Sequence, residues 1–171
     1  MKDFRLHKLV PGLLMVMAYM VVGSVTSGGD WYQGAGPNGN FQVQHAAPSD
    51  WSVVQQRNIA WKLTLPETGQ STPVVCNDRI FFTTYEEVPK DSELGNNIVA
   101  WCVHVRNGRV LWKRDIPGKY PLRLSGCFGD STSPPAVCDG ERVVFVNTSG
   151  RIACFDLKGK PLWSREILSV N

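Results

Sequence analysis

The sequence predicts an all-β fold made of repeated four-stranded antiparallel units, and three observations lead to this prediction. Tryptophan recurs at equal intervals of 51 residues, at Trp61, Trp112 and Trp163. Short segments rich in β-branched and aromatic residues lie between turn pairs such as Asn-Gly and Asp-Gly, which is typical of antiparallel strands. The 171 residues include 43% hydrophobic and only 19% charged side chains, which excludes a disordered chain or a coiled coil.

Two blocks of sequence recur along the chain. The stretches around the three tryptophans resemble one another: residues 60–66 (AWKLTLP), 111–117 (LWKRDIP) and 162–167 (LWSREI). A second block, residues 72–82, matches residues 134–145, and Cys76 and Cys138 stand at corresponding places in it. Repetition at this spacing predicts stacked units, each of which needs a neighbour to bury its apolar surface.

The first unit is predicted to hold four strands joined by tight turns and one long loop. Its strands are expected at Pro73–Cys76, Arg79–Tyr85, Ile98–Val105 and Arg109–Ile116. Asn77-Asp78 is expected to turn the first pair, and Asn107-Gly108 is a strong two-residue hairpin signal for the last pair.

The second unit repeats this order. Its strands are expected at Ala136–Cys138, Arg142–Asn147, Arg151–Asp156 and Pro161–Ile167, with turns at Asp139-Gly140, Ser149-Gly150 and Lys158-Gly159. Apolar runs such as Val143 to Val146 do not alternate with polar residues, so both faces of the strands should be covered. Four-stranded antiparallel units that stack face to face are the blades of a β-propeller.

The stretch from Ala100 to Trp112 resembles the quinoprotein-like (PQQ-like) β-propeller repeat, whose pattern is a small residue, an Asp, then Thr-Gly-Lys and a Trp. Residues 153–163 follow the same pattern, and residues 30–39 resemble the Trp and Gly-Pro-Asn motif of exported members. The residues that match the repeat are Gly108, Arg109, Trp112, Asp156, Gly159, Lys160 and Trp163. The chain departs from it at His104 and Asn107, where Asp and Thr are usual.

This resemblance implies a partial quinoprotein-like propeller of about two blades, residues 71–116 and 132–168, within a repeat segment that spans residues 58–171. The conserved indoles of the family pack between neighbouring blades, which gives Trp61, Trp112 and Trp163 a docking role. Residues 58–65 carry a fourth-strand motif without its first three strands, so they are expected to be an orphan closing strand. Missing blades, or another copy, are then needed to cover the open blade edge.

The N-terminus has the pattern of a signal peptide. Basic residues precede a 14-residue apolar run, Leu9 to Val22, and small residues follow it. A membrane-spanning helix needs about 20 such residues, so we predict a cleaved signal-peptide helix over residues 1–27 and an N-terminal extension over residues 28–57. Export to the periplasm or the extracellular space follows, with anchoring by an uncleaved signal segment as the alternative. Membrane contact is expected only through this segment.

The cysteines and charges carry weaker signals. None of the five cysteines is adjacent to another or in a CxxC pair, so small buried strand residues are favoured over disulfides or a metal site. Cys102 and Cys154 occupy equivalent places, as do Cys76 and Cys138, which favours the same interpretation. The net charge of +3 comes mostly from the leader, so nucleic-acid binding is not expected.

Two long loops are the candidate binding region. In a four-stranded meander, the loops between strands two and three and those between units emerge on one face, and residues 86–97 and 118–130 both belong to these classes. Long loops gathered on a rigid scaffold commonly bind ligands or partners. The candidate residues are Glu86, Glu87, Tyr120, Arg123, Phe128 and Asp130. A salt contact between the two loops is the simpler alternative.

These features favour an exported, non-catalytic binding or scaffold propeller whose long-loop face takes a protein partner. Family enzymes hold pyrroloquinoline quinone (PQQ) with an adjacent-cysteine disulfide and a calcium site, and this chain has no adjacent cysteines. No cofactor, metal ligand or catalytic residue is therefore expected. The alternatives are an N-terminal fragment of a PQQ-dependent alcohol dehydrogenase, which would need PQQ and calcium, or a truncated gene product without function.

Overall fold

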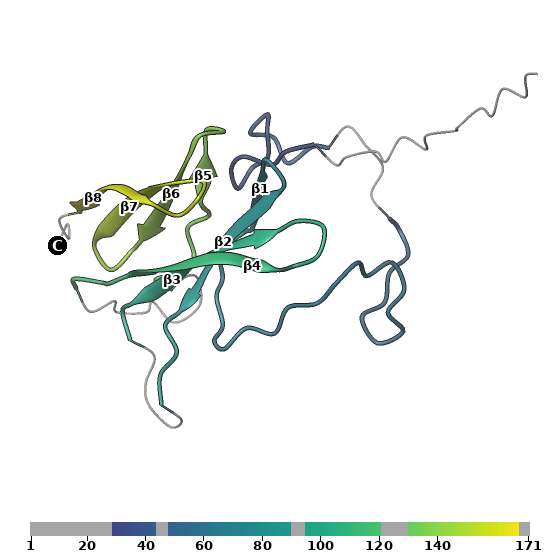
Figure 1. The fold of residues 1–171 in the computed structure, drawn as a ribbon, viewed down its shortest axis with the longest axis horizontal. Helices are drawn as coiled ribbons and strands as arrows, with labels where there is room; N and C mark the ends of the chain where they lie inside the picture. The colour runs from purple at the N-terminus through teal and green to yellow at the C-terminus, as the bar shows by residue number, and fades with distance from the viewer. Residues whose placement is uncertain (1–28, 44–47, 90–94, 121–129, 168–171) are drawn as a thin grey trace, which may run out of the picture.

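The computed structural model describes residues 29–43, 48–89, 95–120 and 130–167, and all regular structure within these ranges is β (Figure 1). The strands of the first sheet, blade 1, are β1 (Val74–Cys76), β2 (Arg79–Tyr85), β3 (Ile98–His104) and β4 (Val110–Ile116). The strands of blade 2 are β5 (Val137–Cys138), β6 (Arg142–Asn147), β7 (Arg151–Asp156) and β8 (Pro161–Glu166). Each blade is an antiparallel meander in chain order, so the predicted partial propeller of two blades is confirmed.

The strand ends follow from turn chemistry. Cys76 pairs with Arg79 across a two-residue turn in which Asn77 (φ 49°) and Asp78 (φ 61°) are both left-handed. This is the type I′ geometry that matches the twist of a hairpin, and Asn and Asp tolerate it best after Gly. The predicted Asn77-Asp78 turn is therefore confirmed.

The β3–β4 turn differs from the prediction of a two-residue Asn107-Gly108 hairpin. The loop has four residues, 105–108, and is closed by hydrogen bonds from His104 N to Arg109 O (2.9 Å) and from Gly108 N to His104 O (2.9 Å). In this loop only Gly108 (φ 66°) is left-handed, whereas a type I′ turn needs two such residues. The pairing of β3 with β4 also shifts register between Cys102 and Val103, next to this longer loop.

The β5–β6 turn also lies one residue later than predicted. Asp139 N donates to Arg142 O, which leaves Gly140 (φ 95°) and Glu141 as the turning pair in place of Asp139-Gly140. The carboxylate of Asp139 accepts hydrogen bonds from Glu141 N (2.9 Å) and Arg142 N (2.7 Å), and these bonds hold its pKa below the usual range. Three residues thus separate Cys138 from Arg142, whereas two separate Cys76 from Arg79, so this hairpin is one residue longer than its counterpart in blade 1.

The main core lies between the two blades, which pack face to face. Val74, Phe81, Cys102 and Trp112 form a cross-strand row on blade 1 that is almost wholly buried. Blade 2 meets this row with aromatic rings: Phe81 lies 6.4 Å from Phe145, and Trp112 lies 6.2 Å from Phe145 and 5.9 Å from Phe155, centroid to centroid. Such spacing is favourable for tilted aromatic pairs.

Residues 58–65, expected to be a closing strand, form no strand in the structure. Sheet structure requires ladder hydrogen bonds, and no described strand runs beside this segment to supply them. Its side chains still alternate, with Ile59, Trp61 and Leu63 half-buried and the residues between them exposed. The predicted signal-peptide helix of residues 1–27 lies outside the described residues. Nothing in the described ranges forms a helix capable of spanning a bilayer.

Candidate functional site

The loops between β2 and β3 and between the blades meet on one side of the molecule, as the meander predicts. Gly118 N donates to Asn97 Oδ1 (3.0 Å), which joins the end of the first long loop to the start of the second. The buried amide of Asn147 donates to Asn96 O (2.8 Å) and to Ile116 O (2.9 Å). We call this side the loop face. Its described segments are residues 67–70, 86–89, 95–97, 117–120, 130–133 and 147–150.

Asp130, a candidate from sequence, uses its carboxylate for hydrogen bonds within its own turn and does not present it to solvent. Only 8% of the residue is exposed, and Oδ1 accepts hydrogen bonds from Thr132 N (2.8 Å), Thr132 Oγ1 (2.5 Å) and Ser133 Oγ (3.4 Å). Thr132 O in turn accepts from Thr83 Oγ1 (2.9 Å) on β2. Burial, together with the charge of Asp130, raises the pKa of Tyr85. Asp130 therefore shapes the link between the blades.

The other acidic candidates differ in their surroundings. Glu86 is half-buried, and its carboxylate accepts a hydrogen bond from Asn97 Nδ2 (2.7 Å), so it ties together the two ends of its own loop. Glu87 is exposed. Of the acidic candidates, Glu87 is the one whose side chain is open to a partner.

Tyr120 covers the turn before β7. A Cβ atom on Gly150 would lie 2.6 Å from Tyr120 Cδ2, so the ring rests directly on that glycine. The neighbouring Lys119 lies 5.4 Å from the ring and pairs with Glu166, which lowers the pKa of Glu166. The described ion pair of this loop thus goes to β8 and not to the acidic loop. Arg123 and Phe128, the remaining candidates, lie outside the described residues.

The tryptophan motif forms a docking site between the blades. A Cβ atom on Gly159, in the β7–β8 turn, would lie 2.7 Å from the indole of Trp112, and Gly159 is left-handed (φ 82°). Trp112 Nε1 donates to Leu157 O (3.1 Å) in the same turn. The glycine thus makes room for a ring whose N–H is satisfied by the adjacent backbone.

Trp61 makes the same pair of contacts with blade 1. Its ring would lie 2.4 Å from a Cβ atom on Gly108, and its Nε1 donates to Val105 O (2.7 Å). Residues 58–65 therefore occupy, relative to blade 1, the place that β4 occupies relative to blade 2. The third indole, Trp163, is 40% exposed. No described residue supplies it with a glycine turn.

The uncovered surface of blade 2 extends beyond that indole. Val137, Val144, Cys154 and Trp163 form a cross-strand row that corresponds to the buried row of blade 1. Val137 is 51% exposed and Leu162, beside Trp163, is 45% exposed. Cys154 itself is buried, and we call the surface formed by Val137, Val144, Leu162 and Trp163 the open face.

A shallow groove of about 320 Å³ lies between the end of β4 and strands β7 and β8. Asp115 and Arg151 both line it, so its charge selects neither an anion nor a cation. Arg151 Nε is buried without a hydrogen-bond partner among the described residues, but the guanidinium also lies 3.7 Å from Glu166. The groove therefore identifies no ligand class.

The described residues do not fit the cofactor set of the dehydrogenase alternative. Within them, no three His, Cys, Asp or Glu side chains gather where a metal ion would bind. A disulfide joins Cys76 to Cys138, which corrects the expectation that these were unpaired strand residues, but the two cysteines come from different blades. Cys102 and Cys154 are free and buried, as expected. No step through PQQ or calcium is derived from this arrangement.

Comparison with known proteins gives one family and two similar solved structures. The family model described as outer membrane protein assembly factor BamB, a PQQ-like repeat family, matches residues 55–169. A quinohemoprotein alcohol dehydrogenase from Pseudomonas putida HK5 is 21% identical, with a TM-score of 0.43, over 64% of this chain and 15% of that chain. BamB from Moraxella catarrhalis is 16% identical, with a TM-score of 0.44, over 68% of this chain and 30% of that chain. No protein of curated function matches the chain.

This chain spans less than a third of either solved protein. The family model, in contrast, covers well over half of the chain, including both blades and residues 58–65, which we call the Trp61 segment. The blade topology and the repeated tryptophan–glycine docking agree with that match. The chain therefore belongs to the PQQ-like β-propeller repeat family represented by the outer membrane protein assembly factor BamB.

Proposed function

We propose that this chain contributes to an exported, non-catalytic propeller scaffold whose loop face binds a protein partner. The observation that supports this most is the convergence of the two long loops on one side of two rigid blades, where Asn97, Gly118 and Asn147 hold them together. Fold membership alone does not assign an activity, so the proposal depends on this surface.

Export is part of the proposal. Disulfides persist mainly in oxidising compartments, and the Cys76–Cys138 bond fits such a compartment. The basic and apolar leader of residues 1–27 favours the same route. We place the protein in the periplasm or outside the cell.

The open face is expected to be covered by a further repeat unit. Trp163 needs a turn with a left-handed glycine and a free carbonyl, which is what Trp61 and Trp112 use. Gly108 and Gly159 are already occupied by those two indoles, so a second copy of this chain offers neither of these two docking turns.

Site-specific photo-crosslinking of the full chain in its native cells tests the loop face. A photoreactive amino acid would replace Glu87 or Thr148, both exposed on the loop face. Matched controls would carry it at Asn107 or Lys158, which are exposed in the turns on the opposite side. A discrete crosslinked protein from the loop-face positions alone is the expected result.

Equal crosslinking from both sides, or none from the loop face, would contradict the proposal. A second experiment replaces Tyr120, Arg123 and Phe128 together with alanine in the full chain that carries the crosslinker at Glu87. Loss of the crosslinked band is expected. An unchanged band would show that these three residues take no part in binding.

A further inference from the structure

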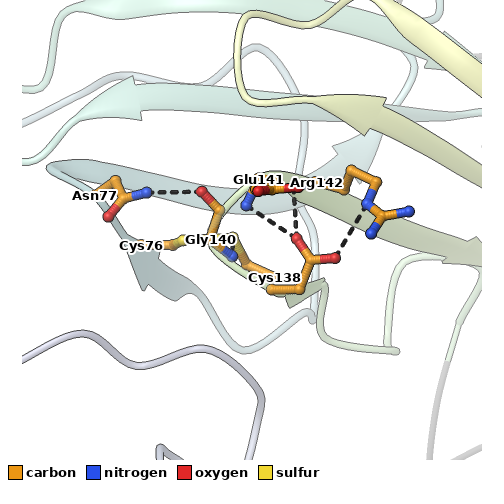
Figure 2. A network of polar contacts seen from close by, with 7 residues as sticks. Cys76, Asn77, Cys138, Gly140, Glu141 and Arg142 are labelled. Atoms are coloured by element: carbon orange, nitrogen blue, oxygen red, sulfur yellow. Dashed lines mark hydrogen bonds and ion pairs between the residues drawn. A yellow bond between two sulfur atoms is a disulfide. The ribbon is translucent and has the colours of Figure 1, made fainter.

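The disulfide lies at a buried junction between the first strands of the two blades. Cys76 ends β1 and Cys138 ends β5, with Cα atoms 6.6 Å apart and exposed fractions of 0% and 5% (Figure 2). Beside it, Asn77 Nδ2 donates to Gly140 O (2.8 Å), which joins the turns that follow the two cysteines.

The two cysteines meet because the two hairpins differ in length by one residue. Cys76 is followed by a two-residue turn and faces blade 2 together with Val74. Cys138 is followed by the longer hairpin, and it pairs with Val143, whose side chain faces blade 1. A shift of one residue moves the side chains of a strand to its other face. Cys138 therefore points back toward blade 1 while Cys76 points toward blade 2, so the two cysteines face each other.

A segment near the N-terminus covers this junction. We call residues 30–36 the N-terminal strap. Trp31 pairs with Val75 on β1 through two backbone hydrogen bonds (2.7 and 2.9 Å), and Tyr32 O accepts from Cys138 N (2.9 Å) on β5. Asp30 Oδ1 accepts a hydrogen bond from Asn77 N (3.2 Å).

The side chains of the strap pack as well as its backbone. Trp31 packs against the core cluster that contains both cysteines, and its ring rests on Gly36. Gly34 lies against Pro135, just before β5, where a Cβ atom would approach the proline ring to 2.7 Å. One short segment thus holds β1 and β5 together on the side where the disulfide joins them.

We propose that the N-terminal strap is a seal that controls reduction of the Cys76–Cys138 disulfide. Reduction requires a thiolate of the reductant to attack one sulfur in line, while the S–S electron pair leaves with the other sulfur, which takes a proton. When the reductant is a dithiol, its second thiolate then attacks the mixed disulfide. This releases the cysteine whose sulfur was attacked first, as a thiol, and leaves the reductant oxidised to its own disulfide. With the strap in place Cys76 and Cys138 are only 0% and 5% exposed, so under this proposal release of the strap precedes attack by the thiolate. This inference is independent of the loop face.

The proposal is tested by measuring the rate at which the disulfide is reduced in the full chain, in an extract of the cells that produce it and without purification. Dithiothreitol is added at pH 8, samples are quenched with N-ethylmaleimide, and peptide mass spectrometry quantifies labelling at each cysteine. The variants are Trp31→Ala and the milder Asp30→Ala, which removes the acceptor for Asn77 N. The matched control is Trp51→Ala, which removes a 63% exposed indole outside the strap.

Reduction of Cys76 and Cys138 is expected to be at least tenfold faster in both strap variants and unchanged in Trp51→Ala. Cys102 reports on folding, because it is a fully buried free thiol and burial raises its pKa to about 12. Cys102 should stay unlabelled on the same timescale. Unchanged rates at Cys76 and Cys138, or an equal rise at Cys102, would overturn the proposal, because reduction would then not depend on the strap.

Discussion

At the scale of single residues, the glycines of the outer turns are explained by contact as well as by backbone conformation. Gly159 is left-handed and lies directly beneath Trp112, whereas Gly140 is left-handed (φ 95°) with no atom within 4 Å of where a Cβ would stand. The two positions therefore separate the cost of the conformation from the cost of the lost contact.

Replacing each glycine with alanine should reveal that difference. Gly140→Ala should lower the free energy of unfolding by roughly 1–2 kcal/mol, the cost of a left-handed alanine. Gly159→Ala should cost about 1–3 kcal/mol more, because the added methyl group would overlap the indole of Trp112 and push it away from the turn. Urea denaturation of both variants measures the two values. Equal losses would mean that the Trp112 contact contributes nothing to stability.

The buried thiol of Cys102 predicts a pH dependence. Burial raises its pKa to about 12 in the folded chain. An unfolded cysteine ionises near its ordinary pKa of about 8.5. The folded state therefore binds the proton more tightly, and stability is unaffected below the unfolded pKa and falls as the pH rises from about 9 toward 12.

The check is to compare wild type with Cys102→Ala by urea denaturation between pH 7 and pH 11. The loss of unfolding free energy across this range should be smaller in the variant, whatever the absolute stability of the two proteins. Parallel curves would show that Cys102 does not contribute. Tyr85, whose pKa is also raised by burial, is present in both proteins and cancels in the comparison.

The resemblance to the family implies a docking role for Trp61 and Trp112, and the structure adds that each indole packs against a left-handed glycine of the next unit. Neither the resemblance nor the residue types could predict the role of Asp130. An isolated carboxylate in a long loop resembles a ligand, and only the structure shows that Thr132 and Ser133 satisfy it. Trp163 is also expected to dock, but it is 40% exposed and no described glycine turn lies against its indole.

At the scale of elements, the strand positions were largely predictable, since polar turn pairs mark where each strand ends. Strands β2, β6 and β7 begin and end at the predicted residues. The turn types were harder, because Asn107-Gly108 forms part of a four-residue loop and the β5–β6 hairpin gains a residue. That extra residue turns Cys138 toward blade 1, which is why matching positions in the repeat wrongly suggested two unpaired cysteines.

The disulfide should make a large contribution to the stability of the blade pair. It closes a loop with a sequence separation of 62 residues. A chain-entropy treatment gives about 4 kcal/mol for a loop of this size. The double variant Cys76→Ser, Cys138→Ser should therefore unfold at clearly lower urea concentration than oxidised wild type.

Dithiothreitol provides the control for this prediction. Fully reduced wild type should resemble the double variant, and the double variant should not respond to the reductant. If oxidised wild type and the double variant unfold at the same urea concentration, the bond adds no net stability. Unfolding followed by intrinsic tryptophan fluorescence suits the measurement, because Trp112 is buried at the blade interface.

At the scale of the whole molecule, the chain is a stack in which every blade surface needs a neighbour. Blade 1 is covered on one side by blade 2 and contacted on the other by the Trp61 segment. Blade 2 has blade 1 on one side and the open face on the other. Contiguous apolar surface of this kind promotes association when nothing covers it.

Residues 28–171 expressed alone should therefore associate through the open face, giving insoluble, oligomeric or only partly ordered protein. The variant Val137→Lys, Leu162→Lys should run at lower apparent mass than wild type in size-exclusion chromatography, because two charges repel an apolar partner surface. The matched control is Val53→Lys, Val54→Lys, which adds the same charge at residues that are 49% and 94% exposed. If wild type is already a cooperative monomer, or if both variants dissociate equally, the open face does not drive association. A drop in mass confined to the open-face variant would identify this surface as the one that a further repeat must cover.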